Sequence, residues 1–201
     1  MKKRIFIIFA CFLTGCSLFP EGKEPPPLYT LKNTSVTSAS PLHASLAIEL
    51  PRSEPSLDTY RIGVTLLPYS REYIENGQWP EYLPKTLLEY FMETFTERWG
   101  GASINRAEDG LQTSYTLYSH IHDFSLYPSE NGCTDIRLKI SFKLVDFQTR
   151  RSIAARIFSK TVRVPIYTME GITAAFNQGL HELTGETMGW IEEIVHKDKH
   201  L

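Results

Sequence analysis

Residues 134–147 impose the tightest constraint on the fold, because their side chains alternate strictly between apolar and polar. The apolar positions are Ile136, Leu138, Ile140, Phe142 and Leu144, and the polar positions between them are Arg137, Lys139, Ser141 and Lys143. Successive side chains of a β-strand point to opposite faces of the sheet. This period of two predicts a long strand, Thr134–Phe147, with one face buried and the other in water.

Two more long strands are expected beside it, at Ser114–Tyr127 and Ser152–Val164, and the three together form an antiparallel meander. The run Ser-Glu-Asn-Gly at residues 129–132 has the composition of a hairpin connection. In the first of these strands the apolar residues change parity between Ile121 and Phe124, which predicts a β-bulge near His122-Asp123.

Shorter strands are expected at Ser45–Leu50, Tyr60–Leu67 and Ala102–Asn105, and Asn76-Gly77 marks a turn. The second of them has alternate apolar residues on one face, namely Ile62, Val64 and Leu66.

Two long amphipathic helices are also expected. The first lies within Trp79–Trp99, and its start moves to about Leu83 because Pro84 fits only a first helical turn. Its apolar stripe consists of Trp79, Leu83, Leu87, Phe91 and Phe95. The second spans Met169–His196 with Thr168 as its N-cap. Its stripe consists of Ile172, Phe176, Gly179, Leu183, Thr187, Trp190 and Ile194.

These elements predict an α/β single domain, in which a mixed, mostly antiparallel sheet packs against two long helices. Their order is β-β-α-β-β-β-β-α. The second strand, the first helix and the short third strand are expected to form a right-handed parallel crossover.

The amino terminus has the pattern of a bacterial lipoprotein signal. A basic start at residues 2–4 precedes an apolar run at residues 5–12 and then Leu-Thr-Gly-Cys at residues 13–16. In such signals the cysteine thiol receives a diacylglycerol, the chain is cut before the cysteine, and the new amino group is acylated. The alternatives are a plain signal peptide or a short membrane helix with a chance cysteine, but the apolar run is far below the ~20 residues that a span needs.

The expected organisation is therefore a signal peptide at residues 1–15, a lipidated Cys16 with a tether rich in Pro, Ser and Thr at residues 16–43, and a folded domain at residues 44–201. The proline-rich part, residues 17–27, reaches roughly 30 Å from the bilayer at ~3 Å per residue.

Charge and cysteine content limit the function classes. Removal of the signal leaves 18 basic against 23 acidic residues, so the formal net charge goes from −2 to −5. An acidic chain is not attracted electrostatically to nucleic acid, so the sequence gives no reason to expect nucleic-acid binding. Attachment to a membrane has to come from the lipid. Cys11 leaves with the signal and Cys16 carries lipid, so Cys133 has no partner for a disulfide. We expect Cys133 to be a small packed residue rather than a nucleophile.

Motifs that carry chemistry are missing from the sequence: there is no phosphate-binding glycine loop, nucleophile elbow, zinc spacing or dinucleotide fingerprint. Two imidazoles, His120 and His122, are expected to share a strand face beside Asp123, but a metal site needs three or four ligands. We therefore expect no catalytic residue, cofactor or metal. The candidate partner contacts are Tyr69, Tyr73 and Trp79, since Tyr and Trp are common at interface hot spots. For Trp79 the alternative is that it closes the end of the core.

Four segments together resemble the ABC-type transport auxiliary lipoprotein family. They are the lipobox followed by Pro25-Pro26-Pro27 and Tyr29-x-Leu31; Leu57-Asp58-Thr59-x-Arg61-Ile62; Tyr73 with Trp79; and Ala174-Ala175-Phe176-Asn177-x-x-Leu180 with Trp190-Ile191. Gly179, where the family pattern suggests Ala, and the polar loop Arg52-Ser53-Glu54 depart from it.

The resemblance implies a non-enzymatic partner of an MCE-type (mammalian cell entry) transport system, which carries phospholipid or other hydrophobic molecules between membranes. The lipoprotein would sit on the periplasmic face of the outer membrane and dock the periplasmic MCE-domain protein there. Ser17 after Cys16 favours the outer membrane, because Asp at that position retains lipoproteins at the inner membrane in enteric-type bacteria. A homo-oligomeric ring is compatible with the family.

Two other functions remain open on the sequence. One is an envelope lipoprotein that activates or scaffolds a cell-wall or outer-membrane assembly machine. The other is an envelope hydrolase, which needs a nucleophile paired with a base.

Overall fold

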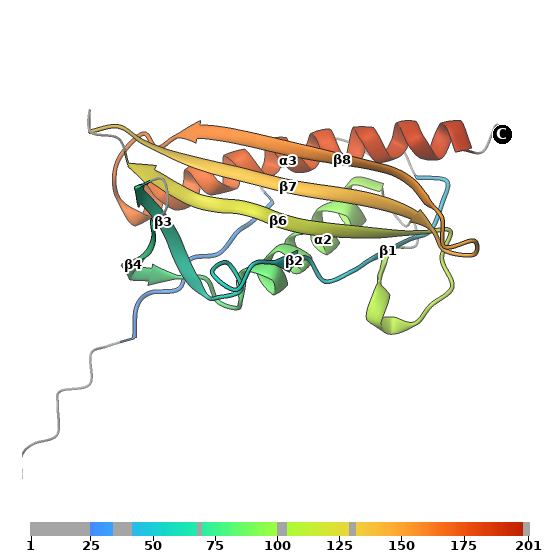
Figure 1. Ribbon diagram of the computed structural model, residues 1–201, viewed down its shortest axis with the longest axis horizontal. Coiled ribbons are helices and arrows are strands. Elements are labelled where there is room, and N and C mark those ends of the chain that lie inside the picture. The colour runs from blue at the N-terminus through green and yellow to red at the C-terminus, as the bar shows by residue number, and fades with distance from the viewer. Residues whose placement is uncertain (1–24, 34–41, 68–69, 100–103, 129–131, 199–201) are drawn as a thin grey trace, which may run out of the picture.

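The computed structural model places three long strands across two helices in an α/β domain (Figure 1). The residues that the structure describes are 25–33, 42–67, 70–99, 104–128 and 132–198. The predicted signal peptide and Cys16 lie outside these ranges.

The predicted meander is confirmed. β6 (Tyr115–Pro128) pairs antiparallel with β7 (Thr134–Asp146), and β7 pairs antiparallel with β8 (Ser152–Arg163). All five alternating apolar residues of β7 are buried. The register between β6 and β7 shifts between Ile121 and Asp123, as the change of parity predicts.

The other side of β6 is lined by three short strands that all run parallel to it: β1 (Leu46–Ile48), β2 (Arg52–Ser53) and β3 (Arg61–Leu67). β5 (Ile104–Arg106) pairs with β1. β3 and β5 run in the same direction in this sheet, so α2 makes the predicted parallel crossover between them, although β6 and β1 lie between the two strands. Of the three alternate apolar residues of β3, Ile62 and Val64 are buried, whereas Leu66 is half-exposed near the end of the strand.

A further strand, β4 (Ser70–Gln78), is missing from the predicted order, and it forms an edge by pairing antiparallel with β3. The predicted turn at Asn76-Gly77 is wrong, because both residues belong to this strand. Edge strands bury little, so β4 lacks the alternation that marks the central strands. β2 was also missed, because it is only two residues long between Pro51 and Pro55.

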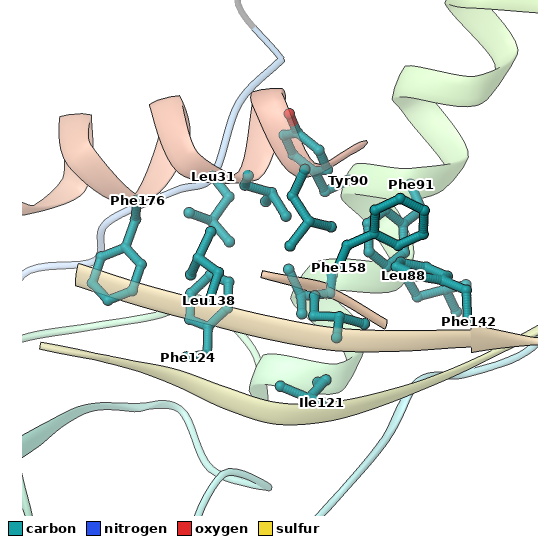
Figure 2. Packing of buried hydrophobic residues seen from close by; sticks show 14 of the residues in the cluster. Leu31, Leu88, Tyr90, Phe91, Ile121, Phe124, Leu138, Phe142, Phe158 and Phe176 are labelled. Carbon is teal, nitrogen blue, oxygen red and sulfur yellow. The ribbon is translucent and has the colours of Figure 1, made fainter. Parts of the chain in front are cut away.

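The helices α2 (Leu83–Trp99) and α3 (Met169–Asp198) cover one face of the sheet and carry the core. Figure 2 shows Phe124, Leu138 and Phe176 toward one end of this layer, and Leu88, Phe91, Phe142 and Phe158 toward the other. The rings of Phe124 and Phe176 are stacked with centroids 4.8 Å apart, and Phe158 meets Trp190 edge to face. The predicted stripe of α2 is buried throughout, and the helix begins at Leu83 with Pro84 in its first turn. None of the described helices is long and apolar enough to span a bilayer.

Gly179 sets how closely α3 packs on the sheet. A Cβ atom there would lie 3.0 Å from the Cδ1 atoms of Ile136 and Leu138, whereas a Cβ at Gly185 would meet nothing within 4 Å. We expect Gly179→Leu to lower the free energy of unfolding by about 1–3 kcal/mol through overpacking. Gly185→Leu on the same helix should raise it by up to about 0.8 kcal/mol, because leucine is the better helix former. Urea unfolding of both variants tests this, and equal effects would contradict the close packing at Gly179.

Candidate interaction surface

Trp79 belongs to the core. Its side chain is 1% exposed, and its ring lies edge to face with Phe124 and Phe176 at centroid distances of 5.9 and 5.4 Å. Its backbone N–H donates to the carbonyl of Tyr60 over 2.7 Å. The burial supports the core interpretation of Trp79 over a direct partner contact.

Tyr73 is half-buried on β4 and joins two segments. Its hydroxyl donates to the carbonyl of Ser56 over 3.0 Å, and the guanidinium carbon of Arg61 lies 4.1 Å from its ring centroid. Tyr73 therefore holds β4 against the loop before β3, with part of its ring accessible. The third candidate, Tyr69, lies outside the described residues, so the structure brings only Tyr73 and Trp79 to the same end of the domain.

An apolar surface that the sequence analysis missed lies beside Tyr73. Ile166 and Tyr167 are 66% and 63% exposed, and Leu66 is half-exposed across from them. A groove of about 450 Å³ runs between the β3–β4 hairpin and the start of α3, and Tyr167, Leu66 and Tyr73 are among its lining residues. Its rim includes Glu72 and Glu75. We call Leu66, Ile166, Tyr167 and this groove the docking surface; it suits a partner segment that is apolar with basic flanks.

Local geometry explains why Ile166 and Tyr167 point outward. Val164 closes β8 by donating its N–H to the carbonyl of Thr134 over 2.8 Å, and Pro165 follows. Thr168 then caps α3, because its Oγ1 accepts the N–H of Gly171 over 3.2 Å. A Cβ at Gly171 would lie 2.2 Å from the carbonyl oxygen of Ile166, so only glycine permits this tight turn.

The described part of the predicted tether lies at this same end of the molecule (Figure 1). Tyr29 donates its N–H to the carbonyl of Gln78 on β4 over 2.8 Å, and the N–H of Gln78 donates to the carbonyl of Pro27 over 3.1 Å. Lys32 donates its N–H to Oδ1 of Asn177 on α3 over 2.7 Å, and the side chain between, Leu31, is buried. The chain thus enters the domain beside the docking surface.

The two histidines do share a strand face. The ring centroids of His120 and His122 are 4.7 Å apart, and a ring nitrogen of His122 lies 2.9 Å from Oγ of Ser141. Burial lowers the pKa of His122 below its ordinary value, and His120 and Lys139 add to the effect. Among the described residues no group of three or more His, Cys, Asp or Glu side chains is arranged to hold a metal.

Comparison with known proteins relates the chain to one family. The family model for the ABC-type transport auxiliary lipoprotein component matches residues 29–187. No curated protein matches the chain.

Two solved structures share the fold. A Xanthomonas campestris protein assigned to the family model DUF330 has a TM-score of 0.74 at 19% identity, over 88% of this chain and 97% of that one. An uncharacterized protein has a TM-score of 0.62 at 14% identity, over 78% and 99%. At these identities the likeness shows the fold alone.

Proposed function

The chain belongs to the family of ABC-type transport auxiliary lipoprotein components, and we propose that it is the non-enzymatic component that docks the MCE-domain protein of such a system at the outer membrane. The anchor is the lipid on Cys16, and Ser17 at the next position favours transfer of the lipoprotein to the outer membrane. The observation that carries the docking proposal is the exposed pair Ile166 and Tyr167 beside the groove. Large exposed apolar side chains around a groove mark interaction sites.

The position of the docking surface supports this role. The segment that joins the domain to its anchor contacts β4 and α3, the elements that also border the groove. A partner seated in the groove is therefore held near the membrane that carries the anchor. This arrangement suits a protein that ends a transport path at that membrane.

Aspartate at the two exposed positions tests the docking surface. We expect Ile166→Asp with Tyr167→Asp to cut recovery of the MCE-domain protein by about 30-fold or more, because hot-spot side chains contribute at least about 2 kcal/mol each. The measurement is a quantitative pull-down with the full-length lipoprotein from detergent-solubilised envelopes. Unfolding should stay within about 0.5 kcal/mol of the unchanged protein, because both side chains lie on the surface.

Leu111→Asp is the matched control. Leu111 is a similarly exposed apolar residue that precedes β6, at the end of that strand away from its contact with β3. It should leave recovery unchanged. Equal recovery with the double variant and with Leu111→Asp would contradict the docking surface. Recovery of a cell-wall or outer-membrane assembly enzyme in place of an MCE-domain protein would favour the alternative function.

A further inference from the structure

The face of the sheet opposite the helices carries a hollow that the docking role does not use. β6, β7 and β8 lie in front of both helices in Figure 1, and no described helix covers their near side. Near the β1–β2 end of this face is a depression of about 890 Å³. Its volume falls within the range of roughly 300–1,000 Å³ that is usual for small-molecule sites.

The strand registers explain the hollow. Its floor consists of two cross-strand rows, Arg52–His120–Ser141–Ile157 and Tyr118–Lys143–Ala155. Residues paired across strands share a face, so each row lies on the open side of the sheet. Within these rows Ser141 and Ala155 have short side chains and leave the depression, and the longer side chains of the other residues surround it. We call this site the open-face hollow.

Cationic groups gather at the open-face hollow although the chain as a whole is acidic. Arg52, Lys143 and Arg150 line it and are exposed, whereas Glu49 is its one acidic lining residue. Within the described part of the chain none of these three cations forms an ion pair. Arg52 and Lys143 are separated by two strand spacings and by two residues along the strand, which puts their backbones about 12 Å apart. Two long cationic side chains close such a gap onto one phosphate group.

Apolar side chains flank these cations. Leu50 and Ile157 line the same hollow and are 54% and 55% exposed. Leu50 lies between β1 and β2 on one side of β6, and Ile157 lies on β8 on the other side. Exposed aliphatic groups beside unpaired cations match a ligand with an anionic head and a hydrocarbon body. We propose that the open-face hollow binds one anionic phospholipid, with its phosphate between Arg52 and Lys143 and its acyl chains across Ile157 and Leu50. The proposal takes only the membrane setting from the proposed function, and it does not depend on the docking surface.

Native mass spectrometry of the full lipidated chain, released from detergent micelles, tests the proposal. With phosphatidylglycerol the protein should retain one lipid, at least about tenfold more often than with phosphatidylcholine, because the second headgroup has no net charge. Lys143→Glu should reduce retention by about tenfold or more, and Ala155→Trp should do the same by filling the hollow. Lys139→Glu is the matched control, since it makes the same charge change on the same face of β7 outside the lining, and it should leave retention unchanged.

Four results would overturn the proposal. One is equal retention of the two lipids, and another is an equal loss with Lys139→Glu, which would show diffuse attraction to the sheet face. The third is displacement of the lipid by inorganic phosphate alone, which would make the hollow a phosphate site. Copurification of an acidic peptide without lipid counts against it too. Ile166→Asp with Tyr167→Asp should leave lipid retention intact, so failure of this proposal and failure of the docking role are distinguishable.

Discussion

A chain with Cys16→Ala and a conventional cleavable signal in place of residues 1–15 should leave the membrane fraction completely and lose its transport phenotype. Each buried CH₂ of an acyl chain contributes about 0.8 kcal/mol, and two or more chains are needed for stable anchoring. Removal of the predicted signal would take the formal net charge from −2 to −5, and such a charge gives no general attraction to anionic membranes.

The folded domain should be indifferent to this change, because its core lies between residues 31 and 195. Fractionation of cells, thermal unfolding and a transport phenotype assay measure the three consequences. Cys133→Ala is the matched control, as it removes the other cysteine of the mature chain, a free and partly buried one. It should keep the protein in the membrane fraction. Retention of the Cys16→Ala chain in membranes, or full transport without the anchor, would show that the lipid is not part of the mechanism.

Trp79→Ala should lower the free energy of unfolding by about 3–5 kcal/mol, the usual cost of removing a large buried aromatic side chain. The indole packs edge to face against both Phe124 of β6 and Phe176 of α3, so its loss opens a cavity where sheet and helix meet. Domains of this size have a total stability of about 5–15 kcal/mol. The variant is therefore expected to unfold at a much lower urea concentration.

Tyr82→Ala separates this effect from a general effect of aromatic loss. Tyr82 lies three residues further along and is half-exposed, so its removal should change stability by less than about 0.5 kcal/mol. An unchanged urea midpoint together with loss of partner recovery for Trp79→Ala would contradict the core interpretation. Trp79 would then be a partner contact.

Helices and strands that are buried on one face were predictable, because such burial makes apolar residues recur in the sequence at the period of the helix or strand. The alternation of β7 and the stripe of α2 each correspond to buried residues in the structure. β4 carries no such period, since it forms an edge of the sheet and most of its residues are partly or fully exposed. Its pairing with β3 depends on tertiary position, which local sequence does not report.

The two candidate surfaces were hidden from the sequence for different reasons. Ile166 and Tyr167 lie between a strand and a helix, where no periodicity applies, although the apolar residues after Pro165 are a usable signal. The open-face hollow joins residues far apart in the chain, such as Arg52 and Lys143, and only the strand registers bring them together. Tyr73 remains a predicted partner contact on sequence grounds, and its side chain lines the groove of the docking surface.

Site-specific photo-crosslinking in cells tests the central claim, docking of an MCE-domain protein at the outer membrane. A photoreactive residue replaces Tyr167 in one full-length chain and Leu111 in another, and the inner and outer membranes are separated before the adducts are identified by mass spectrometry. The proposed function predicts an adduct with an MCE-domain protein from position 167, in the outer-membrane fraction, and none from position 111. An adduct with a cell-wall enzyme, or no MCE-domain protein at either position, would contradict it.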